Sequence, residues 1–137
     1  MNGTPPVIVL VEDEPSVLSI MTRVLVRSGY EVMAFEAPLK ALAFLRSASA
    51  PSLLLTDVVM PGMSGFELCD AVRRRFPDLP VIFTSGYPLE NLPGYARPLP
   101  AKSCLIVKPF GLDEVRETID CLLQTSGEAF STAARDL

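Results

Sequence analysis

Five short apolar segments recur along the chain at similar intervals, and this repetition restricts the fold more than any other feature of the sequence. They are residues 7–11, 31–35, 53–56, 81–85 and 104–107. Each has the length of one β-strand. Four are continuously apolar, which is typical of strands covered on both faces of a parallel sheet, whereas 31–35 mixes apolar and polar residues and indicates an edge strand.

Segments of helical period separate these strands. The third begins with a capping box, in which Ser64 is followed three residues later by Glu67. Pro15 and Pro38 suit the first turns of the two earlier helices, and the last helix is expected over 112–123. The residues expected to face the core are Leu18, Met21 and Leu25 in the first helix, Leu39, Leu42 and Leu45 in the second, Leu68, Val72 and Phe76 in the third, and Leu112, Val115, Ile119 and Leu122 in the last.

The alternation of strands and helices predicts an α/β fold with a doubly wound parallel sheet. Right-handed crossovers make the flavodoxin-like five-strand order 2-1-3-4-5 a common solution for such a chain. One connection departs from the pattern, because residues 87–102 contain four prolines. We therefore expect a short or irregular fourth helix there.

The 137 residues are enough for one domain, which we place at 7–125, with an extension at 1–6 and a tail or the start of a linker at 126–137. A net charge of -4 and the absence of a long basic run argue against direct binding of nucleic acid or an anionic membrane. The adjacent Arg73, Arg74 and Arg75 are expected to form a solvated face without function.

The cysteines and the apolar segments indicate a cytoplasmic protein. Cys69, Cys104 and Cys121 are widely spaced and include no C-x-x-C pair, as expected for reduced thiols. The apolar run after the first six residues is too short for a signal peptide or a membrane span. The chain contains no histidine, so any phosphohistidine chemistry must come from a partner.

Three acidic residues follow strands that are neighbours in the predicted sheet. Glu12 and Asp13 come directly after the first strand, and Asp57 comes directly after the third. Ligand sites of doubly wound sheets lie where the strand order reverses, which is between these two strands. Three carboxylates brought together raise one another's pKa or require a cation, and an all-oxygen set selects a hard ion such as Mg²⁺ or Mn²⁺.

A lysine and two hydroxyl groups complete this predicted site. Lys108 follows the fifth strand, and Thr84 and Ser85 end the fourth. An ammonium group and a cation facing Asp57 can share the charge of an incoming phosphoryl group, which would make this aspartate a nucleophile that forms an acyl phosphate. Asp13 alone could equally be a helix N-cap beside Pro15, so the prediction rests on the whole set.

Four segments resemble the receiver domain of bacterial two-component response regulators over about residues 7–123. They read VLVEDEP, LLLTDVVMPGMSGFEL, PVIFTSGY and LIVKPF. The resemblance implies a phosphorylation-dependent switch and not a metabolic enzyme. It implies that Asp57 accepts a phosphoryl group from a phosphohistidine of a sensor histidine kinase or phosphotransfer protein, and that the surface of the fourth and fifth strand-helix units then changes conformation.

The same resemblance implies the metal ligands. Asp13 and Asp57, with the backbone carbonyl of Val59, would bind Mg²⁺. Glu12 would contribute through a water molecule on the metal or through a contact with one of the direct ligands. An apolar Val59 cannot orient a water molecule, and together with Tyr87 it occupies a position that the resemblance links to self-dephosphorylation. We therefore expect a long-lived phosphoryl state.

The resemblance also assigns the switch residues. Ser85, the fifth residue after Pro80, would be the switch hydroxyl that moves toward the phosphoryl group, and Lys108 would be the salt-bridge partner of that group, while Thr84 would face the core. The peptide bond between Lys108 and Pro109 is expected to be cis, as is common in this family. Leu105 departs from the family pattern, which often has an aromatic residue there. The segment DVVMPGMSG is similar to the corresponding segment of receivers fused to sensor histidine kinases. The chain is therefore either a stand-alone domain or a fragment of a hybrid protein.

Three alternatives remain at this stage. A flavodoxin-type protein would bind FMN, but the acids in the loop EDEPS would repel a phosphate. A phosphohydrolase resembling the haloacid dehalogenases would need a second acid where Val59 stands. A receiver-like scaffold that is never phosphorylated requires an experiment to exclude it.

Overall fold

Five parallel strands form one sheet in the computed structural model, which describes residues 4–92 and 98–124. The strand order is β2-β1-β3-β4-β5, which confirms the predicted order. The strands are β1 (Val7–Val11), β2 (Glu31–Phe35), β3 (Leu53–Asp57), β4 (Val81–Ser85) and β5 (Ser103–Val107). The helices are α1 (Pro15–Arg27), α2 (Pro38–Leu45), α3 (Gly65–Arg73) and α4 (Leu112–Gln124), with a 3-10 turn η1 (Leu89–Asn91).

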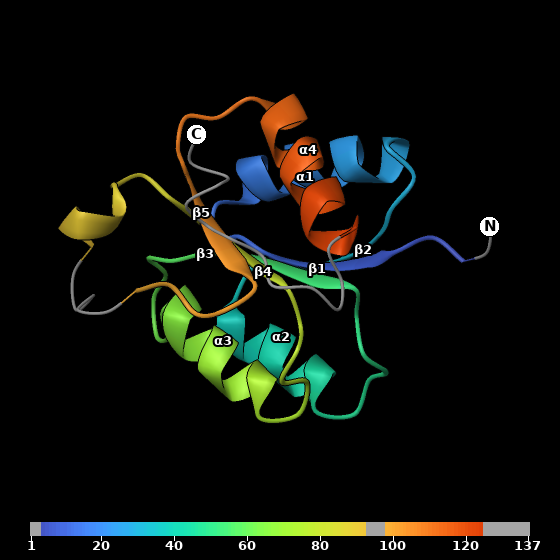
Figure 1. Ribbon diagram of the computed structural model, residues 1–137, viewed down its shortest axis with the longest axis horizontal. Helices are drawn as coiled ribbons and strands as arrows, with labels where there is room; N and C mark the ends of the chain where they lie inside the picture. The colour runs from blue at the N-terminus through green and yellow to red at the C-terminus, as the bar shows by residue number, and fades with distance from the viewer. Residues whose placement is uncertain (1–3, 93–97, 125–137) are drawn as a thin grey trace.

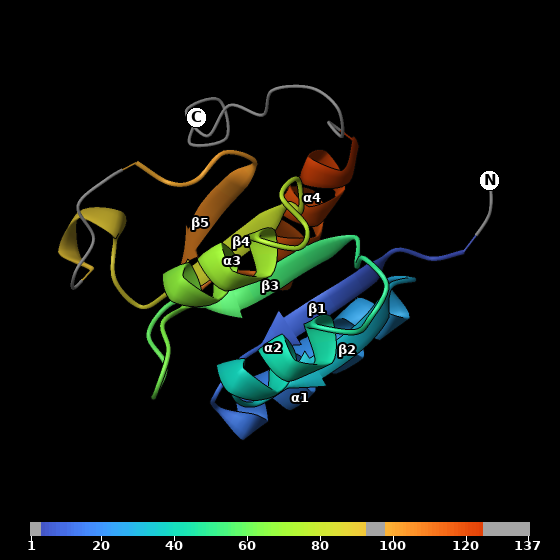
Figure 2. The same cartoon turned by 90° about the horizontal axis from the view of Figure 1, so that it is seen from below.

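Helices cover both faces of the sheet. Helices α1 and α4 lie on one face, and α2 and α3 lie on the other (Figure 1). The view from below shows α2 and α3 crossing the sheet, with β2 at one edge and β5 at the other (Figure 2). Strand β1 pairs with β2 on one side and with β3 on the other. The carboxyl-terminal ends of β1 and β3 are therefore neighbours, and the loops that follow them run apart in opposite directions.

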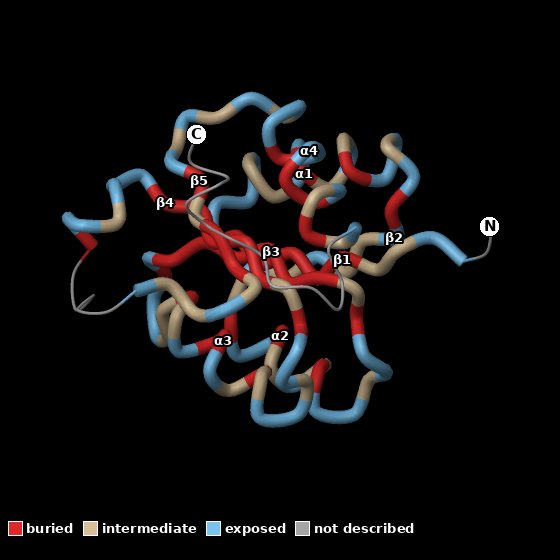
Figure 3. The backbone as a smooth tube through the Cα atoms, in the orientation of Figure 1, coloured by how far each residue is buried: buried red, intermediate tan, exposed pale blue. Residues whose placement is uncertain are grey.

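The core therefore consists of two apolar layers separated by the sheet. Buried residues concentrate along the central strands and on the inner faces of the helices (Figure 3). Every residue of β3 and β4 is buried, as the continuous apolar runs predicted. The largest fully buried side chains include Phe83, Ile8, Leu10, Leu25, Leu53, Leu54, Leu55, Leu68, Ile82 and Ile119.

Two helices differ from their predicted core faces. Leu39 is 60% exposed, because α2 turns the stripe of Pro38, Ala41 and Leu45 toward the core instead. Helix α3 ends at Arg73, so Phe76 lies beyond it and contacts the core only partly. Each of these predictions extended a helical pattern over residues that the sheet cannot cover.

The connection between β4 and β5 is short and irregular, as predicted. Its described part holds only the turn η1, and residues 93–97 lie outside the described chain. Leu92 is buried, while Leu89 and Leu99 pack against the core beside α3. Strand β5 is an edge, so the prediction that it is covered on both faces is wrong at its end, where Val107 is 41% exposed.

The arginine cluster is not a simple solvated face. Arg73 donates hydrogen bonds to the carbonyl oxygens of Leu79 and Lys102, just before β4 and β5 begin. Arg75 donates to the carbonyl oxygens of Leu45 and Ala48 at the end of α2. The prediction is therefore wrong for these two arginines, which satisfy backbone acceptors at the amino-terminal end of the sheet.

The three cysteines are free thiols, with Cys69 and Cys104 buried and Cys121 half-buried. Within 4–92 and 98–124, none of the helices combines the length and apolar character needed to cross a bilayer.

Candidate functional site

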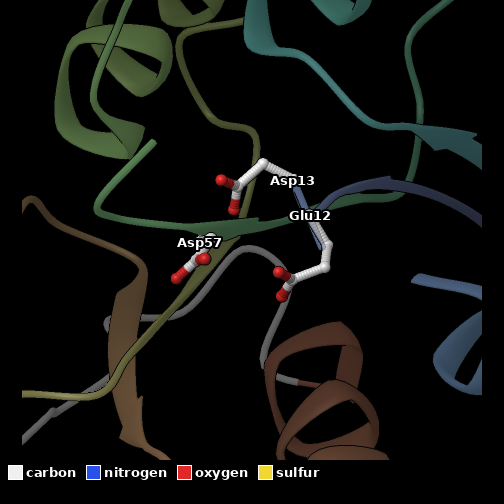
Figure 4. A group of neighbouring side chains, drawn as sticks. All are labelled: Glu12, Asp13 and Asp57. Carbon is white, nitrogen blue, oxygen red and sulfur yellow. The ribbon is translucent and has the colours of Figure 1, made fainter. Parts of the chain in front are cut away.

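Three carboxylates meet at the carboxyl-terminal end of the sheet. Glu12 and Asp13 directly follow β1, and Asp57 is the last residue of β3 (Figure 4). One oxygen from each side chain lies within 4.8 Å of the others. Glu12 and Asp57 are buried, whereas Asp13 is exposed. The predicted convergence of the three acids is therefore present.

Asp57 lies in surroundings that oppose its negative charge. Its Oδ1 atom accepts a hydrogen bond of 3.1 Å from the backbone N–H of Val58. Burial, followed by the charge of Glu12, raises the pKa of Asp57 to about 6, although the ammonium of Lys108 opposes the increase. A carboxylate held in this way benefits from additional positive charge.

Lys108 supplies part of that charge from the end of β5. Its Nζ atom lies 3.1 Å from Oε1 of Glu12 and 3.4 Å from Oδ2 of Asp57. Burial lowers the pKa of Lys108, but the two carboxylates outweigh burial, so that its pKa is raised. The backbone N–H of Lys108 also donates to the carbonyl oxygen of Ser85 at 2.7 Å, and the bond to Pro109 is cis, as predicted.

The donor set fits a hard divalent cation. All three candidate ligands are oxygen donors, and one lysine at 28% side-chain exposure must balance two buried carboxylates and the nearby Asp13. Oxygen ligands of this kind suit Mg²⁺ or Mn²⁺. Asp13, Asp57 and Glu12 are thus the residues that could hold the ion or its water.

Ser85 and Thr84 are both buried at the end of β4, so burial alone does not separate them. Thr84 pairs with Asp57 in the sheet register. The Ser85 hydroxyl accepts a hydrogen bond of 2.9 Å from the backbone N–H of Tyr87, which places it at the start of the β4–β5 connection. Val59, in the loop after β3, is 51% exposed, and Tyr87, in the loop after β4, is 55% exposed.

Two features of the site were not predicted from the sequence. The closer carboxylate partner of Lys108 is Glu12 rather than Asp57. Gly65, the first residue of α3, approaches the backbone of Asp57 so closely that a Cβ atom there would overlap the Asp57 carbonyl oxygen. The small residue just after the capping Ser64 was the available signal for this contact.

Comparison with known protein families matches residues 8–120 to the response regulator receiver domain. The chain is 36% identical over 118 residues to the response regulator receiver protein CpdR of Brucella abortus, covering 85% of this chain and 95% of CpdR. It is 34% identical over 127 residues to the sensor kinase CckA of the same organism, covering 90% of this chain but only 13% of CckA. The solved structure of the response regulator TrrA of Thermotoga maritima, in complex with Mg²⁺ and BeF, superimposes with a TM-score of 0.72 at 28% identity over 85% of this chain and 98% of TrrA.

Proposed function

Because this chain belongs to the response regulator receiver domain family, we propose that Asp57 is the residue that accepts its phosphoryl group. The protein is a phosphoacceptor receiver domain of two-component signal transduction. The observation that carries the assignment is the position of Asp57, buried at the end of β3 with Oδ2 3.4 Å from the Lys108 ammonium.

The phosphoryl donor would be a phosphohistidine of a sensor histidine kinase or phosphotransfer protein. A carboxylate oxygen of Asp57 forms the new O–P bond as the N–P bond of the donor breaks. The bonding electron pair returns to the imidazole nitrogen, so no oxidant or further reactant is required. The positive charge of Lys108 faces the oxygens that gain negative charge during transfer.

Receiver domains bind Mg²⁺ at an acidic pocket, and we assign that pocket to Asp13, Asp57 and the backbone carbonyl of Val59, with Glu12 nearby. A bound Mg²⁺ would supply positive charge to the phosphoryl oxygens and align them with the nucleophile. Asp13 is exposed beside the buried Asp57, so a small hydrated ion can reach both from solvent.

Ser85 is the proposed switch hydroxyl. Its oxygen can keep accepting from the Tyr87 N–H while its O–H donates to a phosphoryl oxygen on Asp57, so a shift of Ser85 toward that oxygen would move the β4–β5 connection with it. Any two-state switch needs about 5.5 kcal/mol of differential stabilisation to pass from mostly off to mostly on. The exposed apolar Val59 offers no group to orient an attacking water, which supports slow loss of the phosphoryl group.

The larger protein context is also a proposal. The chain spans nearly all of CpdR but a small part of CckA, so both a stand-alone receiver, with its domain at 7–125, and one segment of a hybrid kinase are consistent with its length. We place the reaction in the cytoplasm, where the free thiols of Cys69, Cys104 and Cys121 persist. We assign the domain no turnover of a metabolite and no direct contact with nucleic acid.

Phosphorylation by acetyl phosphate tests the proposal. We expect wild-type protein to gain one phosphoryl group, detected by intact mass, only when Mg²⁺ is present. Asp57→Asn should gain none, whereas Asp70→Asn, which changes an exposed acid on α3, should behave like wild type. Equal modification of wild type and Asp57→Asn would reject the assignment. Absence of bound flavin in the same preparation would exclude the FMN alternative.

A further inference from the structure

A groove separate from the acidic site lies at the amino-terminal end of the sheet. It has a volume of about 330 Å³, within the range of ligand-binding clefts, and it is bounded by the loops that precede β3 and β4. Six of its eight lining residues are apolar, and the other two are Arg75 and Asp78. Pro51 of the groove precedes Asp57 by six residues, which span up to about 20 Å in extended chain. The groove and the proposed phosphorylation site are therefore at opposite ends of β3.

Arg75 is held in one orientation by contacts with the protein. Its Nη1 atom donates hydrogen bonds to the carbonyl oxygens of Leu45 and Ala48, and its guanidinium lies over the Phe76 ring, 4.6 Å from the ring centre. These contacts leave Nε–H and Nη2–H without a hydrogen-bond partner in the part of the chain that the structure describes. Because this edge of the guanidinium presents two parallel donors, it can bind a carboxylate through both without losing its present contacts.

Positive charge predominates around this groove, although the chain as a whole carries a net charge of -4. Arg46 and Arg74 are exposed C-cap residues of α2 and α3, which end at this side of the sheet (Figure 2). Among the described residues that line the groove, the only acid is Asp78, and its Oδ1 atom lies 3.4 Å from Nζ of Lys102. The helix dipole favours cations at helix carboxyl ends, which explains their presence but not the unpaired edge of Arg75. The groove is thus complementary to an anionic ligand.

We propose that this groove binds a segment of a partner protein in which an aspartate or glutamate is adjacent to a large apolar residue. The carboxylate would accept hydrogen bonds from Nε and Nη2 of Arg75, and the apolar side chain would cover Pro51 and Phe76. A phosphate or another small anion would leave the apolar lining uncovered. A purely apolar ligand would desolvate the free edge of Arg75 without pairing it. The partner would be attached at the end of the domain opposite to Asp57.

Two tetrapeptides that differ in one functional group test the proposal on the wild-type chain. Acetyl-Gly-Glu-Phe-Gly-amide carries the proposed chemistry, and acetyl-Gly-Gln-Phe-Gly-amide lacks only the negative charge. In ¹H–¹⁵N NMR titrations, we expect the glutamate peptide to give saturable shifts at Nε–H of Arg75 and at the amides of Phe76 and Leu79, with a Kd on the order of 1 mM. The glutamine peptide should bind about tenfold more weakly. Equal binding of the two peptides, or no saturable shift at these groups, would overturn the proposal.

Arg75→Gln tests the paired contact from the side of the protein. It should weaken binding of the glutamate peptide about tenfold. Arg74→Gln is the matched control, because it removes the same charge from an exposed neighbour that does not line the groove, and it should change the Kd by less than about twofold. Equal weakening by the two variants would indicate general attraction to positive charge and would overturn the paired contact. If Arg75→Gln does not fold, the two peptides on the wild-type chain decide the question.

Two further measurements test the kind of ligand and the place of the groove. The small acid 3-phenylpropionate carries a carboxylate and an aromatic ring but no peptide backbone, so it should bind more weakly than the glutamate peptide. Tighter binding of this acid would overturn the assignment to a protein partner. Asp57→Asn should bind the glutamate peptide within about twofold of wild type, because Asp57 is at the other end of β3. A large loss of binding in this variant would show that the two sites are not separate.

Discussion

The two ends of β5 carry lysines with nearly equal exposure but very different partners. Lys102, just before the strand, lies 3.4 Å from Asp78, whose side chain is 86% exposed. Lys108, just after the strand, contacts Glu12 and Asp57, which are 2% and 9% exposed. An ion pair with a solvated partner contributes little, whereas a buried carboxylate depends on its cation. The burial of the partner thus distinguishes the two lysines.

The same contrast extends to the two ends of the sheet. At the amino-terminal end, Arg73 and Arg75 donate hydrogen bonds to backbone carbonyl oxygens, so these charged groups stabilise the fold. At the carboxyl-terminal end, three acids are concentrated and Asp57 has a raised pKa. Charges that are unfavourable for the folded protein indicate a site that is retained for its chemistry. Four substitutions test this division, in order of expected effect.

The largest effect is expected from Gly65→Ala at the carboxyl-terminal end. The new Cβ would overlap the carbonyl oxygen of Asp57 and lie 3.1 Å from Cα of Val58, which are backbone atoms that cannot move independently. We expect a loss of about 3 kcal/mol in the free energy of unfolding, measured by urea denaturation. Gly86→Ala is the control, because a Cβ there meets no atom within 4 Å. Equal stability of the two variants would contradict the close approach.

Asp57→Asn should increase stability, because it removes a buried charge. The pKa of Asp57 is raised from 3.8 to about 6, so the folded state binds the proton more tightly than the unfolded state. Stability from this group is present below about pH 4 and is lost as pH rises through about 6. At pH 7, without divalent metal, we expect Asp57→Asn to gain about 2 kcal/mol over wild type.

The gain from Asp57→Asn should disappear as the pH falls towards 4, since wild-type Asp57 is then also neutral. Urea denaturation across this pH range measures it. Asp70→Asn, at an exposed position on α3, should show no such pH dependence. A destabilised Asp57→Asn at pH 7 would mean that its contacts with Lys108 and Val58 outweigh the cost of burial.

Arg75→Ala tests the amino-terminal end. It removes the donor to the carbonyl oxygens of Leu45 and Ala48 and the contact of the guanidinium with the Phe76 ring, 4.6 Å from the ring centre. We expect a loss of about 1 kcal/mol and faster amide hydrogen exchange at the end of α2. Arg74→Ala, at an exposed neighbouring position, should change neither quantity.

The smallest effect is expected from Asp78→Asn. Its ion pair with Lys102 is exposed on the aspartate side, so the free energy of unfolding should change by less than about 0.5 kcal/mol. Thermal unfolding at low and high salt measures this contribution. A loss comparable to that of Arg75→Ala would show that burial of the partner is not what separates the two ends of β5.

Much of the fold followed from local patterns. Apolar runs of strand length identified β1 to β5, and the capping box of Ser64 and Glu67 marked the start of α3, where both of its hydrogen bonds are present. Helix faces were less predictable. Leu39 continues the apolar pattern of α2 but is exposed, since burial depends on how far the sheet extends beneath the helix.

The sequence by itself determined which residues could form the site, because acids and a lysine directly follow strands whose carboxyl-terminal ends must converge in a doubly wound sheet. Only the tertiary structure decided how these residues share their charges. Whether Lys108 lies closer to Glu12 or Asp57, and whether Arg75 faces solvent or a carbonyl, depends on distances between segments far apart in the chain. Electrostatic energies depend on those distances and on burial, and neither quantity is encoded in any local segment.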